Sequence, residues 1–232
     1  MWDPEEFLKC IWHAFTALDM DRRGKVSKSQ LKVLSLNVCN IMKIPFDPCV
    51  LEDHFKDDDT GPLSEQGYMR YLSNFILNKP QDDFATLELF KFCWTLSYKK
   101  NLSRHLHISR DDAFKVWCIF NFLSENKYPL FIITQEVEYL LKLLTNAMGD
   151  VWSEGKLAEY HVELSLTKSK SLTAWELIEL VGVQLFKNKS PSALTAAINE
   201  VFEELILGIL KQVLETHMQL SVIPHYKVAA EL

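Results

Sequence analysis

The stretch that decides the fold begins at Asp19, ends at Gln30 and reads Asp-Met-Asp-Arg-Arg-Gly-Lys-Val-Ser-Lys-Ser-Gln. Acids stand at its first and third positions, glycine at the sixth, an aliphatic residue at the eighth and a small polar residue at the ninth. A loop that wraps oxygen ligands around Ca²⁺ needs this order, with glycine at the sharp turn. Apolar residues flank the loop at the spacing that an entering and an exiting helix require: Phe15, Leu18, Leu31 and Leu34. The stretch therefore predicts a helix–loop–helix unit of the EF-hand type.

Four residues of this loop are candidate calcium ligands: Asp19, Asp21, Ser27 and Gln30. Position five holds Arg23, which brings a cation towards the metal, and Gln30 at position twelve cannot supply a bidentate carboxylate. Because the affinity of such a loop rises with the number of charged ligands, we expect calcium binding on the order of 10⁻³ M or weaker. The pattern favours a structural loop, with no cofactor or weakly bound Ca²⁺. A genuine calcium sensor is the alternative.

A second, poorer copy of the pattern begins about one repeat later. Its turn and aliphatic positions hold Asp58, Thr60, Gly61 and Leu63. Lys56 at position one and Gly67 at position twelve indicate that this loop does not hold calcium. Its value is structural, since EF-hands work in pairs. Residues 1–80 are therefore predicted to form an EF-hand-like pair.

Two later segments repeat the pattern more faintly. Residues 114–122, the turn at 124–129 and the pair Ile132-Ile133 predict a third degenerate hand. Leu172 and the helix start that follows it predict the second half of a fourth. An ordinary helical bundle built from the same helices is the alternative.

The sequence as a whole predicts an all-α fold of paired, degenerate EF-hand-like units followed by a long amphipathic helix. That helix begins near Pro191 and its apolar stripe consists of Leu194, Ile198, Val201, Phe202, Leu205, Ile206, Ile209 and Val213. Candidate linkers lie at 78–83 and around Gly149. We therefore expect an EF-hand-like pair at 1–80, a second helical region at 81–212, and a divergent tail at 213–232 that is disordered beyond about Leu220.

Composition excludes several classes of function. A net charge of −6 and a pI near 5.7 argue against nucleic acid, because phosphate binding requires a basic surface. No apolar run approaches the roughly 18 residues of a membrane span, and the acidic N-terminus does not resemble a signal peptide. The five cysteines are odd in number and show no CxxC spacing, which indicates reduced thiols and a cytoplasmic location.

The sequence gives no sign of an enzyme. It contains no nucleophile-bearing turn, phosphate loop or paired-acid motif. His105 and His107 lack a third metal ligand nearby and indicate a surface loop. The tryptophans on apolar helical faces favour core packing: Trp12, Trp94, Trp117 and Trp175. Protein partners are therefore expected.

The sequence also resembles the switch-associated protein 70 family over about residues 7 to 212. The stretches that carry this resemblance include 14–19, 24–35, 67–69, 93–96, 121–130, 174–180 and 197–206. Members of that family continue into a pleckstrin-homology domain that binds phosphoinositides, and into a coiled coil linked to Rho-family GTPase exchange and actin.

What the resemblance implies for this chain is an EF-hand-like interaction and regulatory module of a Rho-GTPase and actin signalling protein. A weak calcium-binding sensor module remains the alternative. Residues 213–232 lack the glycine, basic and aromatic pattern of a pleckstrin-homology first strand. Phosphoinositide binding is therefore not expected of this chain, and a truncated isoform is indicated.

Overall fold

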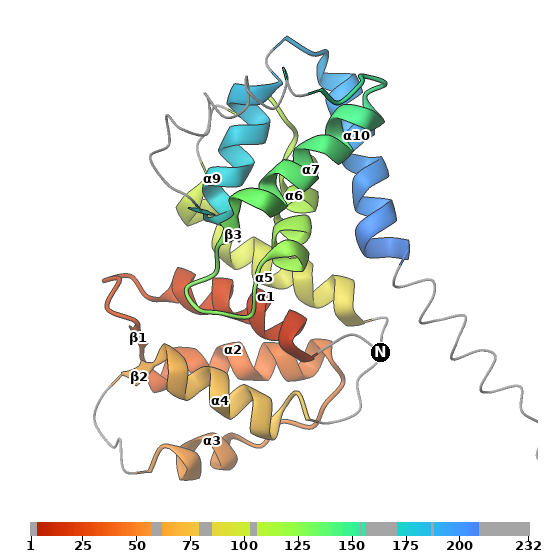
Figure 1. Cartoon of the computed structure of the whole chain (residues 1–232). Coiled ribbons are helices and arrows are strands. Elements are labelled where there is room, and N and C mark those ends of the chain that lie inside the picture. The colour runs from red at the N-terminus through yellow and green to blue at the C-terminus, as the bar shows by residue number, and fades with distance from the viewer. Residues whose placement is uncertain are drawn as a thin grey trace, which may run out of the picture.

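Helices make up most of the computed structural model, and the predicted all-α fold is confirmed. The structure describes residues 4–56, 62–78, 85–102, 106–153, 155, 171–186 and 188–208. Figure 1 shows α2, α3 and α4 on one side of α1 and α5, with α6, α7, α9 and α10 on the other. Within the described residues, no helix combines the length and the apolar character that a membrane span requires. The predicted tail at 213–232 lies outside the described residues.

The first hand pair is formed by four helices and two short strands. In chain order these are α1 (Pro4–Leu18), β1 (Lys25–Val26), α2 (Lys28–Ile41), α3 (Pro48–His54), β2 (Leu63–Ser64) and α4 (Glu65–Phe75). The strands pair antiparallel, with Val26 opposite Leu63, the two residues at the aliphatic loop positions. Both side chains are buried. The two loops are therefore joined back to back. The turn of the second loop, at 57–61, lies outside the described residues.

The later elements repeat this arrangement. They are α5 (Ala85–Asn101), α6 (Arg110–Leu123), β3 (Ile132–Ile133), α7 (Thr134–Ala147), β4 (Ser171–Leu172), α9 (Ala174–Glu179), the π-helical turn η1 (Leu180–Leu185), α10 (Pro191–Phe202) and the π-helical turn η2 (Glu203–Leu207). β3 pairs antiparallel with β4, and Ile132 stands opposite Leu172. A second strand pair thus joins the segments expected to form the third and fourth hands. The division into regions 1–80 and 81–212 stays a prediction.

Side-chain caps explain where the exiting helices begin. Ser27, Ser64 and Thr173 each follow a buried strand residue, and each side-chain oxygen accepts a hydrogen bond from the backbone N–H three residues later. Such a bond pairs one of the amides that the first turn of a helix leaves unbonded. In each of these three units the cap therefore fixes the residue at which the helix begins.

The predicted amphipathic helix near Pro191 is present, but its hydrogen bonding changes along its length. Ser190 caps α10, and Pro191 occupies its first turn. From Glu203 the backbone continues as η2, in which bonds span five residues. The described part of the apolar stripe is buried: Leu194, Ile198, Val201, Phe202, Leu205 and Ile206. Ile209 and Val213 lie outside the described residues.

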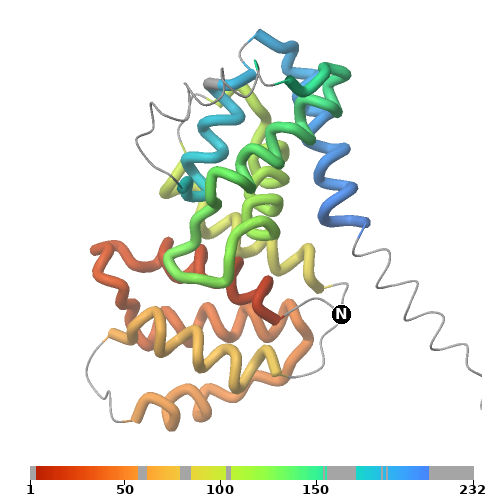
Figure 2. The backbone as a smooth tube through the Cα atoms, viewed as in Figure 1, coloured from red at the N-terminus to blue at the C-terminus, as the bar shows by residue number. Residues whose placement is uncertain are grey.

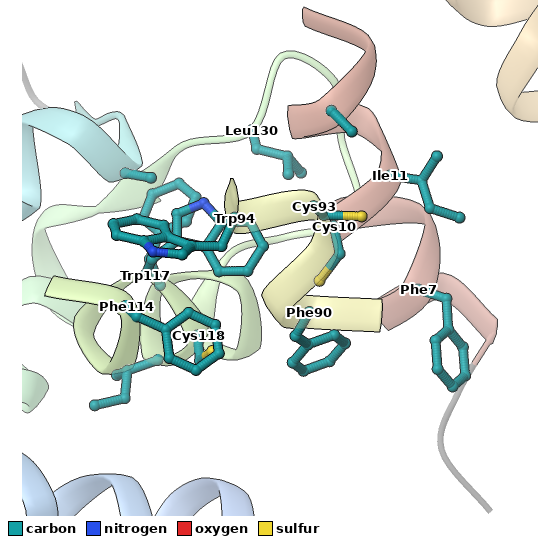
Figure 3. Packing of buried hydrophobic residues seen from close by; sticks show 14 of the residues in the cluster. Phe7, Cys10, Ile11, Phe90, Cys93, Trp94, Phe114, Trp117, Cys118 and Leu130 are labelled. Carbon is teal, nitrogen blue, oxygen red and sulfur yellow. The ribbon is translucent and has the colours of Figure 1, made fainter. Parts of the chain in front are cut away.

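The hydrophobic core is continuous from the first hand pair into the later elements. α5 packs along α1, and Figures 1 and 2 show the two helices side by side. Figure 3 shows Cys10 of α1, Cys93 and Trp94 of α5, and Trp117 of α6 within the same packed cluster. Trp117 is fully buried and Trp94 nearly so. Four of the five free cysteines are buried, and only Cys49 is exposed.

A buried cation connects α1 to the end of α6. Lys9 is 2% exposed, and its Nζ donates to the backbone oxygens of Asn121 at 2.8 Å and Ser124 at 2.7 Å. The same Nζ donates to Glu6 Oε1 at 2.9 Å. An ammonium is stable in such a place only when its donors are bonded. Lys9 therefore fixes how the first helix sits against the second half of the chain.

Replacing Lys9 with methionine is expected to destabilise the protein strongly. Lys9→Met keeps an apolar side chain of similar length but removes the ammonium that bonds the Glu6 carboxylate and the backbone oxygens of Asn121 and Ser124. Removing one partner of a buried ionic contact typically costs about 3–5 kcal/mol. The free energy of unfolding should be measured by urea titration.

The matched control is Lys91→Met, which breaks an ion pair with Glu88 on the surface of α5. Both partners of that pair are more than half exposed, so its loss should change the free energy of unfolding by under about 1 kcal/mol. Equal stabilities of the two variants would contradict the structural role of Lys9.

Candidate functional site

The first loop closes through hydrogen bonds from its own backbone. Asp19 follows the end of α1 and is 8% exposed. Its Oδ1 accepts from the Arg23 N–H at 3.1 Å, and its Oδ2 accepts from the Gly24 N–H at 2.7 Å. Gly24 has a φ of +68°, a conformation that glycine adopts without strain. The carboxylate at position one therefore stabilises the turn through two backbone hydrogen bonds.

The other predicted ligands differ in their partners. Ser27 Oγ donates to Gln30 Oε1 at 2.8 Å and accepts from the Gln30 N–H at 3.3 Å, so these two side chains cap α2. Asp21 is exposed. All four predicted ligands nevertheless line one hollow of about 470 Å³. The structure thus brings Asp19, Asp21, Ser27 and Gln30 to one place.

The side chains that line this hollow are poorly suited to bind calcium. Ca²⁺ takes six to eight oxygen ligands, several of them carboxylate oxygens. Here two carboxylates and two neutral side chains line the hollow, and Arg23 lines it as well. The Asp19 carboxylate already accepts two backbone hydrogen bonds. Among the residues that the structure describes, no group of three or more His, Cys, Asp or Glu side chains is placed to hold a metal ion.

Lysine side chains occupy the C-terminal ends of the entering helices. Lys100 of α5 reaches the end of α1, where its Nζ donates to the backbone oxygens of Asp19 at 2.8 Å and Thr16 at 3.2 Å. Lys28 donates to the Phe55 oxygen at the end of α3, and Lys9 does the same at the end of α6. The last carbonyls of a helix lack partners within it and carry partial negative charge.

These lysines were missed by sequence reasoning. The local sequence around Lys100 does not reveal its role, because its partner is the end of another helix. Its Nζ now places a positive charge at the backbone of Asp19, the first residue of the calcium loop. That charge opposes cation binding in the same loop.

A buried histidine lies beside this junction. His13 is 2% exposed and is surrounded by the rings of Trp12, Trp117, Phe120 and Trp175. Burial lowers the pKa of His13 to about 3, and its hydrogen bond with Asn121 opposes the shift only in part. The ring is therefore neutral near pH 7. Its Nε2 lies 3.0 Å from Asn121 Oδ1, so His13 is a second polar link between α1 and α6.

A cavity of about 420 Å³ lies next to His13, between the first loop and the start of α9. Its hydroxyls already have partners, since Thr16 donates to the His13 backbone oxygen and Thr173 donates to Glu176. Neither hydroxyl is hydrogen-bonded to a histidine ring, as an activated nucleophile would be. The contact of the Thr173 hydroxyl with the Glu176 carboxylate is the capping box of α9.

The predicted histidine pair is only partly described. His105 lies outside the described residues. His107 is exposed, and its backbone N–H donates to the Gly182 oxygen at 3.0 Å. This contact attaches the segment before α6 to η1.

Comparison with known proteins agrees with the hand arrangement. Residues 1–94 match the family described as switch-associated protein 70-like, N-terminal EF-hand domain. The chain is 59% identical over 210 residues to Switch-associated protein 70 of Mus musculus, covering 90% of this chain and 36% of that protein. It is equally similar to the Gallus gallus protein of the same name, with the same coverage.

A second group of relatives is more distant. The chain is 46% identical over 216 residues to "Differentially expressed in FDCP 6" of Mus musculus, covering 90% of this chain and 34% of that protein. The chain thus spans about a third of the length of the curated relatives it matches. No solved structure shows significant similarity to it.

The first loop is expected to bind calcium no more tightly than about millimolar. Replacing the two unsuitable ligands, as in Arg23→Asp with Gln30→Glu, should raise the affinity at least about tenfold because it adds two carboxylates and removes a cation. Isothermal titration calorimetry on metal-free protein measures the calcium affinity of the wild type and of the double variant. Adding Asp19→Ala to the double variant should abolish the gain. Micromolar binding by the wild-type chain that disappears in Asp19→Ala would contradict the structural interpretation.

The neutral state of His13 predicts that stability falls in acid. Its pKa in the folded state lies below the ordinary value near 6.5, so below about pH 6.5 the unfolded chain binds a proton that the folded chain does not. Between about pH 7 and pH 4.5 the wild type should lose about 2–3 kcal/mol more than His13→Phe, which cannot titrate there. Urea unfolding across pH gives the difference. Parallel pH profiles would show that folding does not change the pKa of His13.

Proposed function

We propose that this chain, which belongs to the switch-associated protein 70 family through its N-terminal EF-hand-like region, is a calcium-independent interaction and regulatory module of a Rho-GTPase and actin signalling protein. Its partners are proteins, and its place of action is the cytoplasm. The proposal concerns this region alone. Phosphoinositide binding and nucleotide exchange are not assigned to it.

The observation that carries the proposal is the use of the first loop as a fixed structural part. Asp19 accepts two backbone hydrogen bonds, Ser27 and Gln30 cap α2, and Lys100 holds the end of α1. In a calcium sensor the ion supplies the positive charge that organises these groups. Here protein groups take that place. A module built in this way presents the same surface with and without calcium.

A weak calcium sensor is the second candidate, and one observation favours it. The four predicted ligands line a single hollow, so an ion entering it would meet them together. The two candidates differ in what calcium changes. A sensor gains or loses partners when calcium is added, whereas a structural module does not.

Capture of partners from cytosol separates the two candidates. The immobilised chain should retain the same proteins with calcium and with a chelator, and Rho-family GTPases or actin-associated proteins should be among them. The Arg23→Asp, Gln30→Glu variant is the control in which calcium dependence can appear. Capture by the wild-type chain that requires calcium would support the sensor, and capture of neither protein class would contradict the signalling assignment.

A further inference from the structure

An apolar groove separates α2 from α5. It has a volume of about 350 Å³, and the side chains of Leu18, Val33, Leu34, Phe92 and Leu96 line it. α5 packs mainly on α1, so its contact with α2 does not close the space between the two helices. The groove therefore lies outside the packed core and is open to solvent.

Large apolar side chains remain exposed along this groove. Val33 is 60% exposed and Leu96 is 36% exposed, and Leu36, one turn beyond Val33 on α2, is 42% exposed. Met20 is 74% exposed in the neighbouring hollow of the first loop, which shares Leu18 and Gln30 with the groove. Exposed apolar side chains such as Val33 and Leu96 on the walls of an apolar groove are typical of a site of association.

The charges on the two walls are opposite in sign to the charge of the whole chain. α2 contains two lysines and no carboxylate, and one of the lysines, Lys32, is paired with Glu52 of α3. α5 carries Lys91, Lys99 and Lys100, and its only acid, Glu88, is bonded to Lys91 at 3.0 Å. The chain as a whole has a net charge of −6. Lys99 follows Leu96 by one turn, which places a cation near one end of the groove.

We propose that this groove binds an amphipathic helix of a partner protein, whose apolar residues enter the groove and whose flanking residues are acidic. The inference rests on the proposed function and names the surface that performs it. Both walls are helices, so the groove suits apolar side chains at positions i, i+3, i+4 and i+7. Acidic flanks suit the lysines of the two walls, Lys99 among them.

The groove does not depend on a calcium-driven opening. Such an opening moves the two helices of one hand apart, whereas this groove lies between the exiting helix of the first hand and α5. The wall on α5 is fixed from behind by packing on α1, and Lys100 attaches the same helix to the end of α1. Protein contacts therefore hold this wall of the groove in place.

A phage-displayed library of roughly 16-residue peptides, about four helical turns, tests the proposal. Selection on the full chain should enrich peptides with apolar residues at helical spacing and with Asp or Glu on the flanks. Enriched peptides are then measured by fluorescence anisotropy. Val33→Asp should weaken them at least about tenfold, since a charge then enters the apolar contact. Val151→Asp is the matched control, because Val151 is 82% exposed and lies outside the groove.

The variant Lys99→Glu tests separately whether charge contributes to the choice of peptide. It should shift selection away from acidic flanks while leaving the apolar spacing unchanged. Thermal melting of each variant ensures that a folded protein is compared. Equal binding by Val33→Asp, enrichment of basic flanks or no enrichment would overturn the proposal. Self-association of the wild type that Val33→Asp abolishes would also overturn it, since the occupant would then be a second copy.

The two proposals fail in different ways. If Val33→Asp captures the same cytosolic proteins as the wild type, with or without calcium, the groove proposal fails and the interaction function stands. If wild-type capture requires calcium, the proposed function fails, and the peptide selection still decides whether this groove binds a helix.

Discussion

The ammonium of Lys9 and the carbonyl oxygens at the end of α6 meet in the interior, where neither is stable alone. An unpaired ammonium in an apolar surrounding is very costly, and unpaired carbonyls at a helix end are unfavourable as well. Their contact at 2.7 and 2.8 Å pairs both. Because Lys9 lies on α1, the same contact sets the position of α6 relative to the first hand pair. The aromatic cluster around His13 then packs between helices whose spacing is already set.

Lys9 belongs to a wider pattern of lysines at the ends of the described entering helices. Lys28 and Lys100 likewise donate hydrogen bonds to backbone oxygens at the ends of α3 and α1. An entering helix of an EF-hand directs the negative end of its dipole towards the loop, where a bound cation stabilises it. In this chain an ammonium from another helix provides part of that stabilisation. Its position is fixed by the contacts of its own helix with the rest of the fold.

The lysine ammonium groups at the helix ends explain which features of the EF-hand pattern remain in the sequence. Gly24 is needed for the turn, and Val26 and Leu63 join the two loops, so backbone geometry and packing require their residue types. Positions five and twelve serve chiefly to bind the ion, and they hold Arg23 and Gln30. Backbone geometry and core packing thus constrain the first group of residues. The second group is free to change once a protein cation holds the end of the helix.

The sequence predicted the first loop, its pairing with the second and the apolar stripe of α10, because each depends on residues close together in the chain. It did not predict the contacts of Lys9 and His13 with Asn121. Their partners are more than 100 residues away in the sequence, and no local spacing encodes them. Nor did helical spacing predict the π-helical turn η2, because the same apolar stripe continues through it.

The apolar residues of α5 do not form a single stripe, so their spacing alone does not show which face of the helix is buried. Apolar residues stand on all sides of this helix, and a helix of that kind must be covered by more than one neighbour. Leu89, Phe90, Cys93 and Trp94 are covered within the core formed with α1 and α6. Phe92 and Leu96 face α2 across the groove, and Leu96 remains 36% exposed. The apolar character of α5 exceeds what the described fold buries, and the excess lies on the side where a partner helix can complete its covering.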